Sequence, residues 1–211
     1  MDEMEYLEEL IQRYPVLKPV KEPIAQAYEI LKGCYESGHK LLVAGNGGSG
    51  ADSEHIVGEL MKGFKKERKL PDDVVHRLIE ADHKAGTQLA KKLQGALPAI
   101  ALTGHPGLST AFLNDVDGSM IYAQQVYGYG VKGDVLLAIS TSGNAENIHY
   151  ACVTARAKGL KIIGLTGKDG GMLKQDADTA IVVPEQETFK IQELHLPVYH
   201  VLCLMLEEYF F

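Results

Sequence analysis

Residues 41–59, LLVAGNGGSGADSEHIVGE, constrain the fold more than any other stretch of this 211-residue chain. The apolar run 41–44 predicts a buried strand. A glycine-rich turn, residues 45–50, follows it, and then a helix for which Asp52 and Ser53 are the expected polar starters, with an acidic first turn. Strand, glycine-rich turn and helix N-terminus together favour anion binding, because backbone N–H groups and the helix dipole both attract a phosphate.

The same helix carries His55 and Glu59, four residues apart and therefore on one face. An imidazole and a carboxylate beside a phosphate site suggest an acid–base or metal-binding pair. The turn matches neither GxGxxG nor the phosphate-binding loop that ends in Gly-Lys-Ser/Thr. Taken alone, it is as often an ordinary turn as a ligand site, and such pairs are common on helix surfaces.

Bulk properties exclude several classes of protein. Hydrophobic residues make up 45% and charged residues 23%, which is ordinary for a globular domain of this length, and the net charge of −7 argues against nucleic-acid binding. Three scattered cysteines (Cys34, Cys152 and Cys203) without a CxxC indicate reduced core thiols. With no signal peptide and no run long enough to span a membrane, the expected location is the cytoplasm, with no membrane partner.

Apolar strand runs alternate with helical patterns along the rest of the chain. Four further strands are predicted at residues 97–102, 135–139, 161–165 and 180–183. Helices are predicted at residues 1–14, 24–36, 108–113, 121–129, 146–158, 172–175 and 187–211. This alternation predicts a parallel sheet with helices on both faces and ligands beyond the carboxyl ends of the strands.

A second polar loop, Ser140-Thr141-Ser142-Gly143-Asn144, follows directly from the strand predicted at 135–139. Hydroxyl groups and helix N-terminal N–H groups can bind phosphate without a cation. Simple helix capping is the alternative. Phosphate binding is favoured because this loop leaves the same edge of the sheet as the glycine-rich turn.

Two segments leave alternatives open. Residues 62–94 have mixed charge and are interpreted as a solvated helical excursion, or else as a lid or subunit contact; His76 and His83 are expected at its surface. The C-terminal helical pattern carries Gln192, His195 and His200. Pro197 lies inside that pattern and is expected to kink or break the helix.

These motifs together resemble the SIS (sugar isomerase) domain and, within it, the phosphoheptose isomerase family, over about residues 25–211. The resemblance is carried by Gly45–Ser49, by His55 with Glu59, by residues 140–144, by Thr166-Gly167-Lys168-Asp169-Gly170-Gly171 and by Ile191-Gln192-Glu193-Leu194-His195 through His200. The family converts sedoheptulose 7-phosphate to D-glycero-D-manno-heptose 7-phosphate. A small phosphorylated sugar is therefore the expected substrate.

The resemblance implies an α/β fold: a three-layer α/β/α sandwich with a five-stranded parallel sheet, doubly wound as in flavodoxin. Residues 37–211 would form the SIS domain. Residues 1–36 would add N-terminal helices that pack on that domain and on the oligomer, within one globular unit. A homotetramer with sites at the subunit interfaces is expected.

The resemblance also implies a ligand set. One zinc ion per subunit would be bound by residues matching His55, Glu59, Gln192 and His200. Substrate contacts would come from Asn46, Gly47, Gly48, Ser49, Glu59, Asn114, Asp115, Ser140, Thr141, Ser142 and Gln192. Glu59 is the expected base and His200 the expected acid of an enediol(ate) isomerisation. His195 is interpreted as a structural residue or one that supports the ligands.

The sequence departs from the family pattern at Ala145, where a hydroxyl is usual, in the length of residues 62–94, and at Pro197. An alternative is a non-catalytic SIS protein that binds phosphosugar and docks on the DNA replication initiator. His200 argues for the enzyme, because that branch lacks this histidine. A sugar-phosphate-sensing regulator would carry a helix-turn-helix domain, for which the N-terminal segment is too short.

Overall fold

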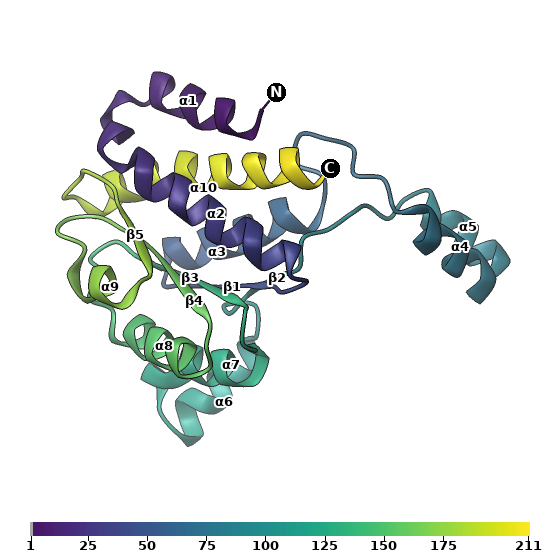
Figure 1. Ribbon diagram of the computed structural model, residues 1–211. Helices are drawn as coiled ribbons and strands as arrows, with labels where there is room; N and C mark the ends of the chain where they lie inside the picture. Colours follow the sequence, from purple (N-terminus) through teal and green to yellow (C-terminus); the bar gives the residue numbers. More distant parts are fainter. Residues whose placement is uncertain (1) are drawn as a thin grey trace.

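The computed structural model describes residues 2–211, which form five parallel strands flanked by helices (Figure 1). The strands are β1 (Leu41–Gly45), β2 (Ala99–Ala101), β3 (Val135–Ser140), β4 (Lys161–Thr166) and β5 (Thr179–Val182). Their order is β2-β1-β3-β4-β5, which is the flavodoxin-like arrangement. The predicted three-layer α/β fold is confirmed.

Two apolar clusters lie on the two faces of the sheet. Successive residues of β3 alternate between them, since Val135 and Leu137 join one cluster and Leu136 and Ala138 the other. The first cluster includes residues of α1 (Glu3–Arg13), α2 (Lys21–Glu36), α3 (Gly48–Met61) and α10 (Thr188–Phe210). The second includes residues of α7 (Ile121–Tyr129), α8 (Glu146–Ala157) and α9 (Gly171–Asp176). A 3₁₀ helix, η1 (Pro15–Val20), links α1 to α2.

The expected start of α3 was wrong, and of the two outcomes expected at Pro197 the break does not occur. Helix α3 begins at Gly48 rather than near Asp52, because the chain turns at Gly47 straight into helical hydrogen bonds, with Gly50 N donating to Gly47 O at 3.0 Å. Its first turn is therefore glycine and serine, not acidic. Helix α10 continues through Pro197 without a break, since buried residues such as Ile191 and Leu202 hold it against the sheet on both sides of the proline.

The excursion after α3 forms a hairpin of two helices, α4 (Asp72–Ala81) and α5 (His83–Ala90), that projects from the body (Figure 1). His76 and His83 are exposed on it, as expected. Residues 62–94 were interpreted as a solvated excursion, but this is wrong for Arg68. Arg68 is 1% exposed and lies at the base of the hairpin. No helix among residues 2–211 combines the length and the apolar character needed to cross a bilayer.

Candidate functional site

The two predicted phosphate loops meet at one cavity of about 360 Å³ at the carboxyl edge of the sheet. The loop after β1 and the loop after β3 form its walls, and α10 closes one side. Its lining includes Asn46, Gly47, Gly48, Ser49, Ser140, Thr141, Ser142, Ala145, Thr188 and Gln192. Eight of the predicted substrate-binding residues thus face a single cavity.

Gly48 allows α3 to approach α10 closely. A Cβ atom at position 48 would lie 2.5 Å from Nε2 of Gln192. The absence of a side chain therefore lets the Gln192 amide sit directly over the N-terminus of α3, where backbone N–H groups have no helical partner. Helix α8 presents its N-terminus to the same cavity from Ala145, which makes no side-chain cap.

A reciprocal amide pair joins the two halves of the cavity. Asn46 Nδ2 donates to Asn147 Oδ1 at 2.9 Å, and Asn147 Nδ2 donates to Asn46 Oδ1 at 2.8 Å. Asn147 was not expected from the sequence. Its place in the first turn of α8, just after the serine-rich loop, is the only local signal for it.

One turn below the cavity, His55 is bound on both ring nitrogens. Its Nδ1 lies 3.0 Å from the Tyr199 hydroxyl and its Nε2 lies 3.1 Å from Glu59 Oε1. Tyr199 donates to Asp52 Oδ1 at 3.3 Å. Burial, together with the neighbouring Asp52, raises the pKa of Tyr199, so this hydroxyl keeps its proton. Neither Asp52 nor Tyr199 was predicted as a site residue, although each is close in sequence to one.

The two contacts of His55 define what each tautomer of its ring can do. With the ring proton on Nε2, His55 donates to Glu59 Oε1 at 3.1 Å and accepts at Nδ1 from the Tyr199 hydroxyl. With the ring proton on Nδ1, Nε2 carries a free electron pair and can bind a cation together with Glu59.

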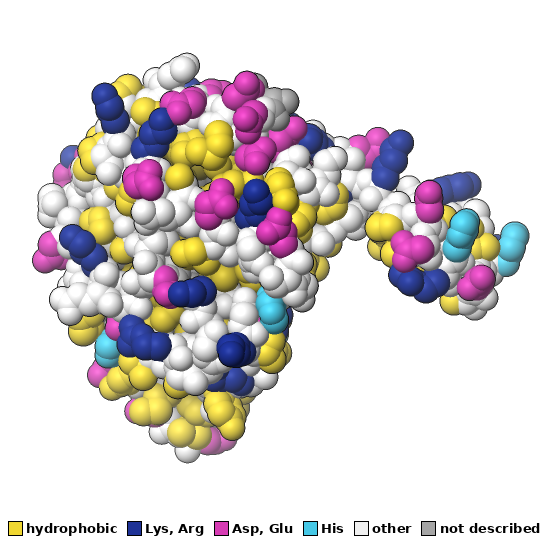
Figure 2. Space-filling model, in the orientation of Figure 1, with side chains coloured by type: hydrophobic (Ala, Val, Ile, Leu, Met, Phe, Trp, Pro, Cys, Tyr) yellow, Lys and Arg dark blue, Asp and Glu magenta, His cyan; other side chains and the backbone are white. Residues whose placement is uncertain are grey.

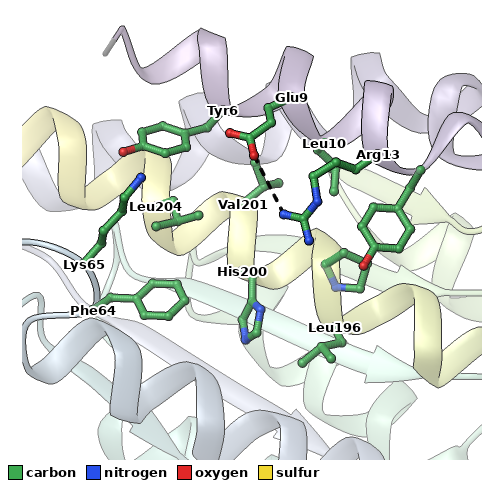
Figure 3. A pocket seen from close by; sticks show the side chains of 12 residues that line it. Tyr6, Glu9, Leu10, Arg13, Phe64, Lys65, Leu196, His200, Val201 and Leu204 are labelled. Atoms are coloured by element: carbon green, nitrogen blue, oxygen red, sulfur yellow. Dashed lines mark ion pairs between the residues drawn. The ribbon is translucent and has the colours of Figure 1, made fainter.

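His200 lies beside this pair. Its ring centroid is 5.1 Å from that of His55 and 5.3 Å from that of Phe64. His200 Nε2 and Glu59 Oε2 are buried and have no hydrogen-bond partner within the described chain, although Lys62 Nζ is 3.6 Å from Glu59 Oε2. Burial, and then the charge of His55, lowers the pKa of His200, which keeps its ring neutral. His200 and Phe64 line a hollow of about 300 Å³ together with residues of α1 and α10, and Figure 3 shows these side chains.

The donor atoms of this cluster suit zinc, which takes imidazole nitrogen and carboxylate oxygen. His55, Glu59 and His200 lie together, and Gln192 lines the adjoining cavity. Among residues 2–211, no group of three His, Cys, Asp or Glu side chains is arranged to hold a metal ion. A shared metal would require the imidazole and carboxylate groups to turn toward one another.

Asn114 and Asp115 lie elsewhere. They end α6 (Pro106–Asp115), are exposed, and bind each other, with Asn114 Nδ2 donating to Asp115 Oδ1 at 2.7 Å. The structure does not bring them to the cavity of the same chain. Their role in substrate binding stays a prediction.

A buried ion pair fixes the end of α3. Glu207 and Arg68 are each 1% exposed, with Arg68 Nε donating to Glu207 Oε1 at 2.8 Å. Glu207 also accepts the N–H groups of Phe64, Lys65 and Lys66 at 2.8, 2.8 and 3.1 Å. Burial opposes the ionisation of Glu207, but these N–H groups and Arg68 outweigh it and lower its pKa.

Arg68 completes this arrangement by reaching the backbone of α3. Its Nη1 and Nη2 donate to the carbonyl oxygens of Leu60 at 2.6 Å and Glu59 at 2.8 Å. We call Arg68 and Glu207 the clamp. It holds the end of the helix that carries Glu59 and places Phe64 against the His200 ring.

His195 is fully buried, and its Nε2 lies 3.2 Å from the Thr166 carbonyl oxygen. Burial lowers the pKa of His195 from 6.5 to about 4. It lines neither the cavity nor the hollow beside His200. The position supports the structural interpretation of this histidine.

Replacing His195 with Gln is expected to reduce the acid sensitivity of the fold. The pKa of His195 is lower in the folded chain than in the unfolded chain, so the unfolded chain takes up the proton first as the pH falls below 6.5. Between pH 7 and pH 5 the wild type should lose about 2 kcal/mol more unfolding free energy than His195→Gln. Urea denaturation at both pH values measures this; equal losses in the two proteins would contradict it.

Comparisons with known proteins agree with this geometry. A model of the SIS domain family matches residues 5–90 and 79–167. A phosphoheptose isomerase of Nitratiruptor sp. is 42% identical over 171 residues, covering 81% of this chain and 78% of the relative. That of Clostridium acetobutylicum is 38% identical over 190 residues, covering 90% and 84%.

Solved structures give the same result. A phosphoheptose isomerase from Francisella tularensis superposes with a TM-score of 0.77 at 34% identity, covering 97% of this chain and 95% of the other. That of Neisseria gonorrhoeae gives 0.75 at 30% identity, covering 97% and 96%. The chain belongs to the SIS domain family and, within it, to the phosphoheptose isomerases.

Proposed function

We propose that this enzyme isomerises sedoheptulose 7-phosphate to D-glycero-D-manno-heptose 7-phosphate. One observation carries the proposal: α3 and α10 each contribute both to the cavity between the two polar loops and to the cluster of His55, Glu59 and His200. Helix α3 provides Ser49 and Glu59, and α10 provides Gln192 and His200. A phosphate held by the loops would therefore place the rest of a sugar chain toward Glu59 and His200.

The reaction moves a proton between neighbouring carbon atoms through an enediol(ate), which needs a base at carbon and an acid at the carbonyl oxygen. We assign the base to Glu59, whose Oε2 is buried without a hydrogen-bond partner among residues 2–211. We assign proton transfer at the oxygen to His200, whose neutral ring can accept and return a proton.

Zinc binding is part of the proposal. His55, Glu59, Gln192 and His200 would hold the ion, and the closeness of His55 Nε2 to Glu59 Oε1, 3.1 Å, supports this assignment. Bound zinc would supply Lewis-acid stabilisation of negative charge on the substrate oxygens. Because a carboxylate bound to a metal is a weaker base, Glu59 would serve as ligand and as base at different stages.

Phosphate binding is assigned to Ser49 and the hydroxyls of Ser140, Thr141 and Ser142. The N-termini of α3 and α8 add unpaired N–H groups and favourable dipoles. Ala145 contributes no hydroxyl, so the backbone carries a larger part of the recognition at that corner of the cavity.

A homotetramer in the cytoplasm remains part of the proposal. Its support is the surface around α6, which has no buried side chain among its described residues and carries Leu113, 64% exposed. Val116, just beyond α6, is also 64% exposed. A neighbouring subunit covering this surface would also come close to Asn114 and Asp115. Three free, buried cysteines are typical of a reducing compartment.

Docking on a replication initiator is not favoured. The relatives at 35–42% identity carry the name phosphoheptose isomerase. His200 lies with His55 and Glu59, as the enzyme requires.

The test is turnover of sedoheptulose 7-phosphate by the purified protein, before chelation, after chelation and after zinc is restored. We expect turnover to disappear with chelation and to return with zinc. Turnover that survives complete removal of metal would contradict the zinc assignment. Binding of the sugar phosphate without turnover under any condition would contradict the enzymatic assignment.

A further inference from the structure

The α4–α5 hairpin buries almost nothing on its own chain. Among the described residues, which include all of α4, that helix has no buried side chain. In α5, Gly86 is the one buried residue. Gly86 lies against the α4 backbone, where a Cβ atom would be 2.0 Å from Leu78 O, so the two helices pack closely against each other. Among the described residues, neither apolar cluster of the body includes a position between 65 and 96.

Such a hairpin needs a partner to be stable. Its helices have ten and eight residues, and isolated helices shorter than about 12–15 residues are marginal in water. Its apolar side chains stay accessible: Val74, Val75, Leu78 and Ile79 are only partly buried, and Leu89 is 43% exposed. Burial of this apolar face must therefore come from another molecule.

The charges of the hairpin favour a second copy of the same chain. Helix α4 carries Asp72, Asp73 and Glu80 against one Arg77, whereas α5 carries Lys84 and no acidic residue and is followed by Lys91 and Lys92. With Asp82 at the turn, residues 72–92 are neutral, although the whole chain has a net charge of −7. Figure 2 shows acidic, basic and apolar side chains intermixed on the projecting hairpin.

A two-fold axis between two copies gives each of the two helices a neighbour of opposite charge. It places acidic α4 of one copy against basic α5 of the other, twice, which is the self-complementarity that an isologous interface requires. A uniformly acidic or basic partner would be attracted by one helix and repelled by the other. The neutral hairpin is also where two copies of a −7 chain can meet without strong repulsion.

The hairpin leaves the body through a narrow neck. Gly95 N donates to Arg68 O at 2.8 Å, and Gly63 N donates to Gln94 Oε1 at 2.7 Å. The two chain segments that lead to the hairpin are thus tied together at its base, and Arg68 is fixed by the clamp. The neck therefore presents the hairpin in a defined position on each copy.

We propose that the α4–α5 hairpins of two copies of this chain pack together as a four-helix bundle, α4 of one copy against α5 of the other. The proposal does not rest on the enzymatic function. It concerns residues 72–92, which contain none of the residues assigned to the site.

Cross-linking of the full-length protein tests the pairing. The three native cysteines are buried, so Leu89→Cys introduces an accessible thiol on the hairpin. We expect a short bismaleimide to link two Leu89→Cys chains into a species of twice the 23.0 kDa chain mass. The matched control is Val153→Cys on α8, where the native side chain is 45% exposed compared with 43% for Leu89.

Self-association gives the second readout. Leu89→Glu places a charge in the proposed bundle, and Gln88→Glu places the same charge at the neighbouring exposed position. In sedimentation over a dilution series, Leu89→Glu is expected to raise the dissociation constant between copies about 100-fold relative to Gln88→Glu.

Cross-linking decides between the outcomes. Linkage of Leu89→Cys no greater than that of Val153→Cys would overturn the proposal, whatever the sedimentation result. Cross-linking of Leu89→Cys together with weaker self-association of Leu89→Glu supports it. Cross-linking of Leu89→Cys with unchanged self-association of Leu89→Glu also supports it and means that other contacts hold the same two copies together.

Discussion

Glu59→Gln is expected to lower kcat for sedoheptulose 7-phosphate by about 10³-fold or more, because the amide can neither take the proton from carbon nor bind a metal as a carboxylate does. Binding of the sugar phosphate should change little, since the cavity that would hold the phosphate is formed by other residues. Steady-state kinetics and calorimetric titration with the substrate measure the two effects. Zinc content of the variant separates the base role from the ligand role: full zinc with lost turnover identifies the base.

Glu54→Gln is the matched control. Glu54 lies on the same helix, is exposed, and lines neither the cavity nor the hollow beside His200. This variant should retain wild-type turnover. Substantial turnover by Glu59→Gln, measured beside it, would rule out the assigned role of Glu59.

Arg68→Met is expected to destabilise the fold by about 3–5 kcal/mol, because it leaves the Glu207 carboxylate buried without its charged partner. The carbonyl oxygens of Glu59 and Leu60 also lose their bonds from Arg68, although Leu60 O keeps the N–H of Leu97. For a chain of this size, such a loss lowers Tm by roughly 10 °C. Thermal denaturation followed by circular dichroism measures the shift.

Arg156→Met provides the comparison for the clamp. Arg156 also bonds a carboxylate, Asp176, but its side chain is 56% exposed. An exposed pair of this kind contributes at most about 1 kcal/mol. Equal shifts in Tm for Arg68→Met and Arg156→Met would show that the clamp adds no more than a surface pair.

Local patterns were enough to predict the sheet and the meeting of the two polar loops at one cavity. Each of the five apolar runs becomes a strand within one or two residues of its predicted position, because a strand buried on both faces has no polar alternation to obscure it. The two polar loops were predicted to meet because each follows a parallel strand. Parallel strands bring their carboxyl ends to one edge of the sheet.

The clamp could not be predicted, because it joins residues 139 positions apart. Arg68 stands in a tract of mixed charge, and nothing local distinguishes it from its solvated neighbours. Similarly, the bond from Tyr199 to His55 spans 144 positions and depends on how α10 lies across α3. The start of α3 was misplaced because capping residues were expected, whereas the glycine backbone begins the helix without them.

The neck at Arg68 and Gly95 has a consequence for the history of this chain. Because the backbone closes on itself there, residues 69–93 can be lengthened, shortened or replaced while both flanking segments keep their places in the body. The hairpin is therefore free to diverge under selection for assembly. Glu59, His200 and the clamp stay under separate selection for chemistry, so one gene can change its quaternary structure without rebuilding its active site.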